Sequence, residues 1–120
     1  MCDSGPVVEV RRQDPGTVVV VVGGEHDLDS APTLQATLED ALADCTHLVV
    51  DLCAATFIDS STVNALVQAK RQADDGSRRF NLVLSTTPIV ERTLEICGVL
   101  PALNRVKTLE DALAPPIVEV

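Results

Sequence analysis

Residues 17–22 form a nearly unbroken β-branched run, a threonine followed by five valines. A strand with one face in water alternates polar and apolar side chains. A continuous apolar run is instead typical of a strand that is covered on both faces. The run therefore predicts a strand inside a sheet that has packing layers on both sides.

The remaining chain alternates between strand-like and helix-like patterns. An Asp14-Pro15-Gly16 turn links the valine strand to a weaker strand before it, which predicts a hairpin. Leu34, Leu38, Ala41 and Leu42 form one helical stripe. The elements expected after the hairpin are a helix from Ser30, a strand at 47–52, a helix at 60–73, a strand at 80–84, a helix at 87–96, a strand at 103–106 and a short helix from Thr108.

This order predicts the fold class. Alternating strand–helix units require parallel strands with right-handed crossovers, and the hairpin adds an antiparallel edge. We expect an α/β fold of one domain, with a mixed, mostly parallel sheet of four to five strands, an N-terminal hairpin and about four helices. A chain of 120 residues is long enough for a single core. The expected domain is 7–113, between tails at 1–6 and 114–120.

Charge and composition argue against nucleic-acid binding. The formal net charge is −9, whereas a protein that binds the phosphate backbone needs a basic face. The only aromatic residues are Phe57 and Phe80, so no Trp or Tyr can stack on bases. An acidic surface suits a partner with a basic or mixed patch. No charged-apolar leader opens the chain and no apolar run approaches about 18 residues, so we expect a cytoplasmic protein that does not span a membrane.

Neither metal binding nor catalysis is indicated. The four cysteines show no Cys-x-x-Cys spacing, and His26 and His47 lie far from any close pair of them. We expect buried or half-buried thiols in a reduced compartment. The Gly-x-Ser-x-Gly elbow and the Gly-rich phosphate loop are both absent. No catalytic residue, metal or cofactor is therefore expected, and the protein is predicted not to be an enzyme.

The most informative polar segment follows the predicted strand at 47–52. A short loop leads to Asp59, Ser60, Ser61 and Thr62, after which a helical pattern begins. One residue suffices to cap a helix, so three hydroxyls behind an acid exceed that need. Because a helix N-terminus favours an attached phosphate, the segment is a candidate phosphoacceptor site. If Ser60 is the cap, the Ser61 hydroxyl points outward; if Asp59 is the cap, Ser60 competes with Ser61.

Three segments carry a resemblance to a known family. Phe57-Ile58-Asp59-Ser60-Ser61 resembles the signature of the STAS domain family, in its anti-sigma factor antagonist branch. Gly24-Glu25-His26-Asp27 resembles that family's Gly-Glu-Leu-Asp turn before its first helix. Cys97-Gly98-Val99 and residues 104–113 resemble its closing strand and helix. The likeness covers roughly residues 7–113.

The resemblance implies a phosphorylation-switched binding protein. The unphosphorylated form is expected to bind an anti-sigma factor, usually a serine kinase, and so to free a sigma factor. Phosphorylation would end that interaction. The family's phosphoacceptor corresponds to Ser61, with Ser60 and Thr62 as alternates. The expected partner-binding residues are Glu25, Asp27, Asp59, Ser60, Ser61, Thr62 and Asn64.

Two alternatives stay open at this point. The family usually has Gly where this chain has Thr62, and a β-branched side chain there is expected to add bulk against a kinase. That difference favours a STAS module that scaffolds a regulatory or transport complex without phosphorylation. A receiver domain that phosphorylates its own aspartate is the other alternative, because Asp51 ends a strand and Lys107 follows later. The receiver needs five strand–helix units, and this chain offers about four.

Overall fold

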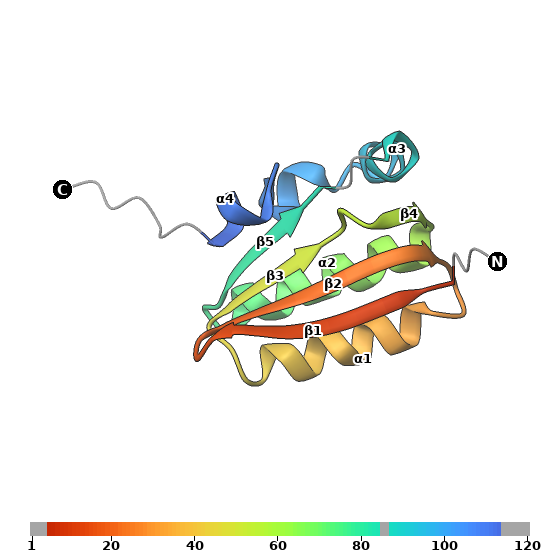
Figure 1. The fold of residues 1–120 in the computed structure, drawn as a ribbon. Coiled ribbons are helices and arrows are strands. Elements are labelled where there is room, and N and C mark those ends of the chain that lie inside the picture. Colours follow the sequence, from red (N-terminus) through yellow and green to blue (C-terminus); the bar gives the residue numbers. More distant parts are fainter. Residues whose placement is uncertain (1–4, 85–86, 114–120) are drawn as a thin grey trace.

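The sheet of this protein is built around two central parallel strands. The computed structural model describes residues 5–84 and 87–113. The elements are β1 (Val7–Asp14), β2 (Thr17–His26), α1 (Ala31–Leu42), β3 (His47–Asp51), β4 (Ala55–Ile58), α2 (Ser60–Asp75), β5 (Arg79–Val83), α3 (Pro88–Ile96), a 3-10 turn (Leu100–Leu103), β6 (Arg105–Val106) and α4 (Leu109–Leu113). The strand order is β1-β2-β3-β5-β6, and β4 pairs with β2 (Figure 1). The expected α/β class, with its antiparallel hairpin and four helices, is confirmed.

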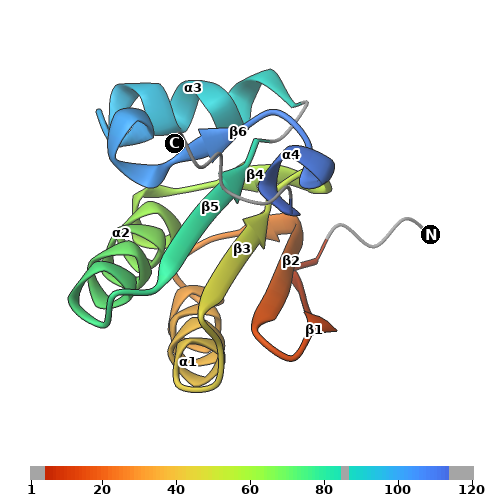
Figure 2. The ribbon, with the colours of Figure 1, turned by 90° about the vertical axis from the view of Figure 1, so that its left-hand side faces the viewer.

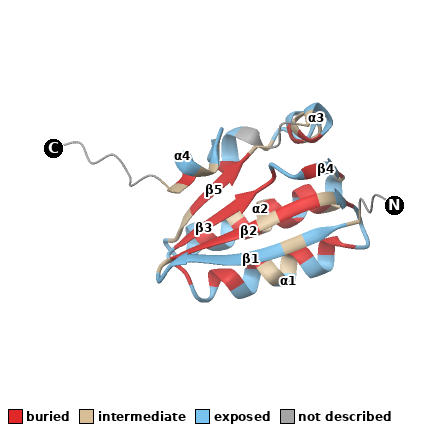
Figure 3. Ribbon diagram, viewed as in Figure 1, coloured by how far each residue is buried: buried red, intermediate tan, exposed pale blue. Residues whose placement is uncertain are grey.

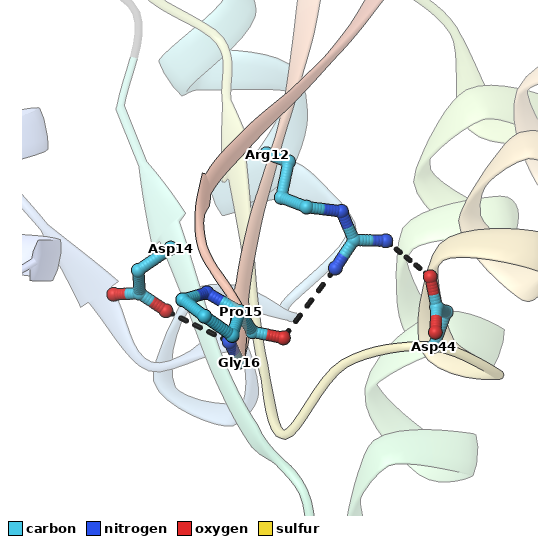
Figure 4. Close-up of polar contacts among 5 residues, drawn as sticks. All are labelled: Arg12, Asp14, Pro15, Gly16 and Asp44. Carbon is cyan, nitrogen blue, oxygen red and sulfur yellow. Dashed lines mark hydrogen bonds and ion pairs between the residues drawn. The ribbon is translucent and has the colours of Figure 1, made fainter.

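The N-terminal hairpin turns at Pro15 and Gly16. The Asp14 carboxylate accepts a hydrogen bond of 2.9 Å from the Gly16 N–H, and this bond lowers the pKa of Asp14. The Arg12 guanidinium pairs with Asp44, beyond the end of α1, and donates to the Pro15 carbonyl (Figure 4). These contacts hold the β1–β2 turn against the C-terminal end of α1.

Both faces of the sheet are covered at its centre, as the valine run predicts. Alternate residues of the central strands, such as Val20 and Val50, pack in one core with α1 and α2. Their neighbours Val19 and Val49 pack on the other face with Ala112 of α4. Figure 2 shows α1 and α2 on one side of the sheet and α4 on the other. Figure 3 shows β2, β3 and β5 mostly buried, whereas β1 is mostly exposed.

The observed strands differ from the expected ones mainly around β2. This strand extends past Val22 to His26, and β4 was not expected at all. The first half of β2 pairs with β3 up to Val21, which lies opposite Asp51. Its last residues then pair with β4, so that Glu25 lies opposite Phe57. The sheet therefore has six strands instead of the expected four to five.

The ends of two later helices follow their sequence signals. Gly98 has a φ of 70° after α3, and the N–H of Val99 donates to the Leu94 carbonyl. This geometry is the Schellman ending that a glycine allows. At α4 the Thr108 hydroxyl accepts a bond of 3.0 Å from the Asp111 N–H, as expected for a helix cap.

His47 at the start of β3 is a buried titratable group. Its Nε2 donates to the Asn81 side-chain oxygen at 2.8 Å, and the residue is 8% exposed. Burial lowers the pKa of the His47 imidazole, and the charge of Arg79 lowers it further, although the Asn81 bond acts the other way. The folded protein therefore holds fewer protons here than the unfolded chain between the lowered pKa and about pH 6.5.

We predict that this histidine makes the fold less stable in mild acid. Its stabilising contribution is complete above about pH 6.5 and is lost as the pH falls through the lowered pKa. Chemical unfolding should show that wild-type protein loses more unfolding free energy than His47→Gln between about pH 7.5 and about pH 5.5. Equal losses in the two proteins would contradict this role. The other titrating groups are the same in both proteins, so the difference between the two losses of unfolding free energy measures the contribution of His47.

Candidate functional site

The site forms where β2, β4 and the start of α2 meet. The register of β2 and β4 places Glu25 opposite Phe57 and His26 opposite Ile58. Asp59 follows directly, and α2 begins at Ser60. These segments lie together at the right-hand end of the molecule in Figure 1. The end of β2 therefore lies beside the segment that leads to Asp59.

Asp59, not Ser60, caps α2. Asp59 has an extended backbone, with φ −115° and ψ −176°, and its carboxylate accepts a bond of 3.0 Å from the Thr62 N–H. Ser60 is therefore the first helical residue and Ser61 the second. The register in which Ser60 is the cap is wrong, and the alternative register, in which Asp59 is the cap, is correct.

The Thr62 side chain points into the protein, next to the Asp59 cap. Its side chain is fully buried, and its hydroxyl lies 3.3 Å from the same Asp59 oxygen. The expectation that Thr62 adds bulk at the surface is wrong, because the β-branched side chain points into the protein. A buried hydroxyl also offers little to a kinase or a partner, unlike the two serines before it.

The two serines and Asn64 lie on the accessible part of the first helical turn. Ser60 and Asn64 are exposed, and Ser61 is half-buried. Asn64 is three residues after Ser61 and four after Ser60, so the three share one side of the helix. No hydrogen bond joins either serine hydroxyl to another residue that the structure describes. The N–H groups of a first turn lack intrahelical partners and can accept an anion.

The carboxylates at the ends of β2 and β3 lie in two different settings. Glu25 and Asp27 are exposed, and the Asp27 carboxylate accepts a bond of 3.0 Å from the Asp29 N–H. This bond holds the loop that leads into α1. Asp51 is buried instead, and its carboxylate accepts a bond of 2.8 Å from the Cys53 N–H. Asp51 therefore shapes the β3–β4 turn.

His26 is a buried part of this site that sequence reasoning did not single out. Its Nε2 lies 2.9 Å from the Gly23 carbonyl and 3.2 Å from that of Val7, and its Nδ1 lies 3.1 Å from the Ser30 hydroxyl. Nε2 therefore donates to the carbonyls, and the ring ties β1 to β2 and to the start of α1. One feature of the sequence could have indicated this role: His26 lies between Glu25 and Asp27, where the related motif has an apolar residue.

Three exposed apolar side chains lie on β4 or on segments next to it, and we call them the apolar rim: Leu28, Phe57 and Ile89. Their exposed fractions are 70%, 37% and 49%. Leu28 is in the loop after β2, Phe57 is on β4, and Ile89 is in the first turn of α3, which packs against β4. Exposed apolar groups beside polar ones are typical of protein-binding surfaces. Their exposure was not predicted from the sequence, although Phe57 is one of only two aromatic residues.

The structure also gives two findings about other kinds of site. Within the described ranges, no three or more His, Cys, Asp or Glu side chains are placed to hold a metal ion together. Among the helices at 5–84 and 87–113, none has the length and apolar character needed to cross a membrane.

The sequence matches the STAS domain over residues 9–112. Anti-sigma-F factor antagonist RsfB of Mycobacterium tuberculosis is 30% identical over 99 residues, which cover 82% of this chain and 80% of the relative. The structure of an anti-sigma factor antagonist from Mycobacterium paratuberculosis superposes with a TM-score of 0.83, at 28% identity, and covers 93% of this chain and 94% of that one. SpoIIAA in its unphosphorylated form shares the fold, with a TM-score of 0.75 at 22% identity over 89% of this chain and 93% of its own. The resemblance drawn from the Phe57–Ser61 segment is therefore confirmed, and the chain belongs to the STAS domain family.

Proposed function

We propose that this protein is an anti-sigma factor antagonist, controlled by phosphorylation of Ser61. The observation that carries the proposal is the start of α2, where a helix capped by Asp59 presents two serines beside exposed carboxylates. The relatives named as anti-sigma factor antagonists support the same function. In this proposal the unphosphorylated form binds an anti-sigma factor that is also a serine kinase, and so frees a sigma factor.

Ser61 is the preferred phosphoacceptor, with Ser60 as its competitor. Ser60 is the more exposed of the two, while Ser61 matches the family's modified serine. A phosphate on the second helical residue lies beside the free N–H groups of the first turn and the positive end of the helix dipole. The protein supplies the hydroxyl. The ATP, the metal ion and the catalytic groups come from the kinase, so the protein itself is not an enzyme.

The partner surface combines the serines with the apolar rim. Leu28 and Phe57 can bury apolar area against the partner, while Glu25 and Asp27 favour basic residues around the contact. Asn64 extends this surface one turn along α2. A regulator of sigma factors acts where transcription takes place, so we place the protein in the cytoplasm, with no nucleic acid or membrane as a direct partner.

The alternatives are less well supported than they were from the sequence. Thr62 favoured a scaffold that is not phosphorylated, and its burial removes that reason. A receiver domain needs an accessible aspartate at a strand end, whereas Asp51 is 9% exposed and is bonded to the Cys53 N–H.

We predict that Ser61→Ala abolishes phosphate incorporation by the cognate kinase. The substitution removes the acceptor oxygen while the Asp59 cap stays in place. Radiolabelled ATP, followed by mass spectrometry of the phosphopeptide, measures the site. Ser60→Ala is the matched control, since it removes the neighbouring hydroxyl and should leave labelling measurable. Full labelling of Ser61→Ala would contradict the prediction and would indicate Ser60 as the phosphoacceptor.

A second prediction concerns the direction of the switch. Phosphate adds roughly −1.5 to −2 charge beside Asp59 and close to Asp27, on a surface shaped for a small hydroxyl. We expect the phosphorylated protein to bind the anti-sigma factor about thirty- to a hundredfold more weakly, which corresponds to about 2–3 kcal/mol. Calorimetric titration of both forms against the partner measures this ratio. Ser61→Ala should bind as the unphosphorylated form does, and equal affinity of the two forms would exclude the mechanism.

A further inference from the structure

A second feature of the structure, separate from the serines, is the outer edge of β1. β1 is the edge strand of the sheet, and all its residues except Val8 are exposed. Val7 is 50% and Val10 is 54% exposed. An edge strand presents unpaired N–H and C=O groups, which can pair with a further strand. We propose that β1 pairs antiparallel with β1 of a second copy of this chain, about a two-fold axis at Val10.

The sheet geometry restricts the possible registers. A two-fold axis perpendicular to the sheet keeps every side chain on its own face, so the axis must pass beside a single residue that pairs with its own copy. Val8, Val10 and Arg12 lie opposite the core valines of β2, on the face that α1 covers. Glu9 and Arg11 lie on the other face, opposite Val21 and Val19.

Charge selects one of these registers. With the axis at Val10, Glu9 lies opposite the partner's Arg11, and Arg11 lies opposite the partner's Glu9. With the axis at Glu9, Arg11 or Arg12, two like charges lie opposite each other. With the axis at Val8, Glu9 lies opposite the partner's Val7 and no opposite charges pair. Opposite charges across two strands stabilise a sheet and like charges destabilise it. The strand is therefore self-complementary in the Val10 register, although charged edges usually prevent association.

The side chains of β1 are already placed for this contact. The Arg11 Nε lies 2.9 Å from the Glu9 carboxylate, and both side chains remain more than half exposed. The two pairs would join into a four-charge cluster across the axis. Arg12 adds no unpaired cation, because Asp44 and the Pro15 carbonyl already hold it (Figure 4).

The other face offers a contact between the two Val10 side chains at the same axis. Val10 borders a surface hollow between β1 and α1, which is lined by Val18, Thr37 and Ala41 together with the charged residues Arg12, Asp40 and Asp44. The partner's Val10 would lie on this face at the mouth of the hollow. Antiparallel pairing also places the two Ser61 sites at opposite ends of the joined sheet, so both stay accessible. The dimer does not depend on the proposed function.

Charge reversal at Glu9 and Arg11 tests the register. Sedimentation equilibrium of the full chain over a wide range of concentration should show a monomer–dimer equilibrium. Glu9→Arg and Arg11→Glu should each raise the dissociation constant about tenfold or more, because each places like charges across the axis. An equimolar mixture of the two variants should recover association, since each variant then meets opposite charges. This recovery would also show that both variants are folded.

Matched controls use the same charge changes on α3, which packs against β4. Glu95→Arg and Arg92→Glu on α3 change exposed residues and should leave the dissociation constant unchanged. A protein that stays monomeric at every concentration would overturn the proposal. So would a dimer that is insensitive to both β1 variants, or a mixture that fails to associate. Deletion of 114–120 should leave the dissociation constant unchanged, and loss of the dimer would overturn the proposal, because it would assign the contact to that segment.

Discussion

The divided pairing of β2 is the constraint on which the rest of the site depends. Its first half pairs with β3, and its last residues pair with β4. The exchange takes place at Gly24, which has a φ of 73° and donates to the Ala54 carbonyl at 3.0 Å. Glycine accommodates that backbone without strain. Because β4 takes over as the neighbour of β2, the chain reaches Asp59 beside Glu25 and Asp27. β4 thus places the first turn of α2 beside the loop after β2, while packing against α1 holds the rest of that helix.

Local sequence patterns predicted the helices and the longer strands well. Packing on the two sides of the sheet requires a regular spacing of apolar residues in these elements, and that spacing can be read from the sequence. The valine run is covered on both faces, and the stripe of Leu34, Leu38, Ala41 and Leu42 is buried as expected. β4 escaped prediction because it has four residues, of which Thr56 and Phe57 are exposed. Its formation depends on pairing with a strand about thirty residues earlier. A short window of sequence does not include that partner strand, so it cannot predict the pairing.

The site was predicted in residue type and only partly in geometry. Asp59 and Ser60 are both good caps, so the choice between them rests on the backbone that β4 imposes. Once Asp59 is extended at the end of β4, Thr62 is turned inward and Ser60 outward. The apolar rim was missed for a similar reason. An apolar residue such as Leu28 is exposed or buried according to the tertiary structure, and its own sequence neighbourhood does not specify which.

The inward position of Thr62 also bears on how a phosphate would act. Asp59 holds the Thr62 N–H and hydroxyl, so the cap is complete without the serine side chains. A phosphate on Ser61 would gain about 1 kcal/mol from the helix end, and nearby carboxylates would oppose it by a similar amount. Neither term is large against a domain stability of about 5–15 kcal/mol. No buried contact has to break for the group to be accommodated. The proposed modification would therefore change the charge and the bulk of a surface on a rigid support, and its effect would fall on a partner that docks there.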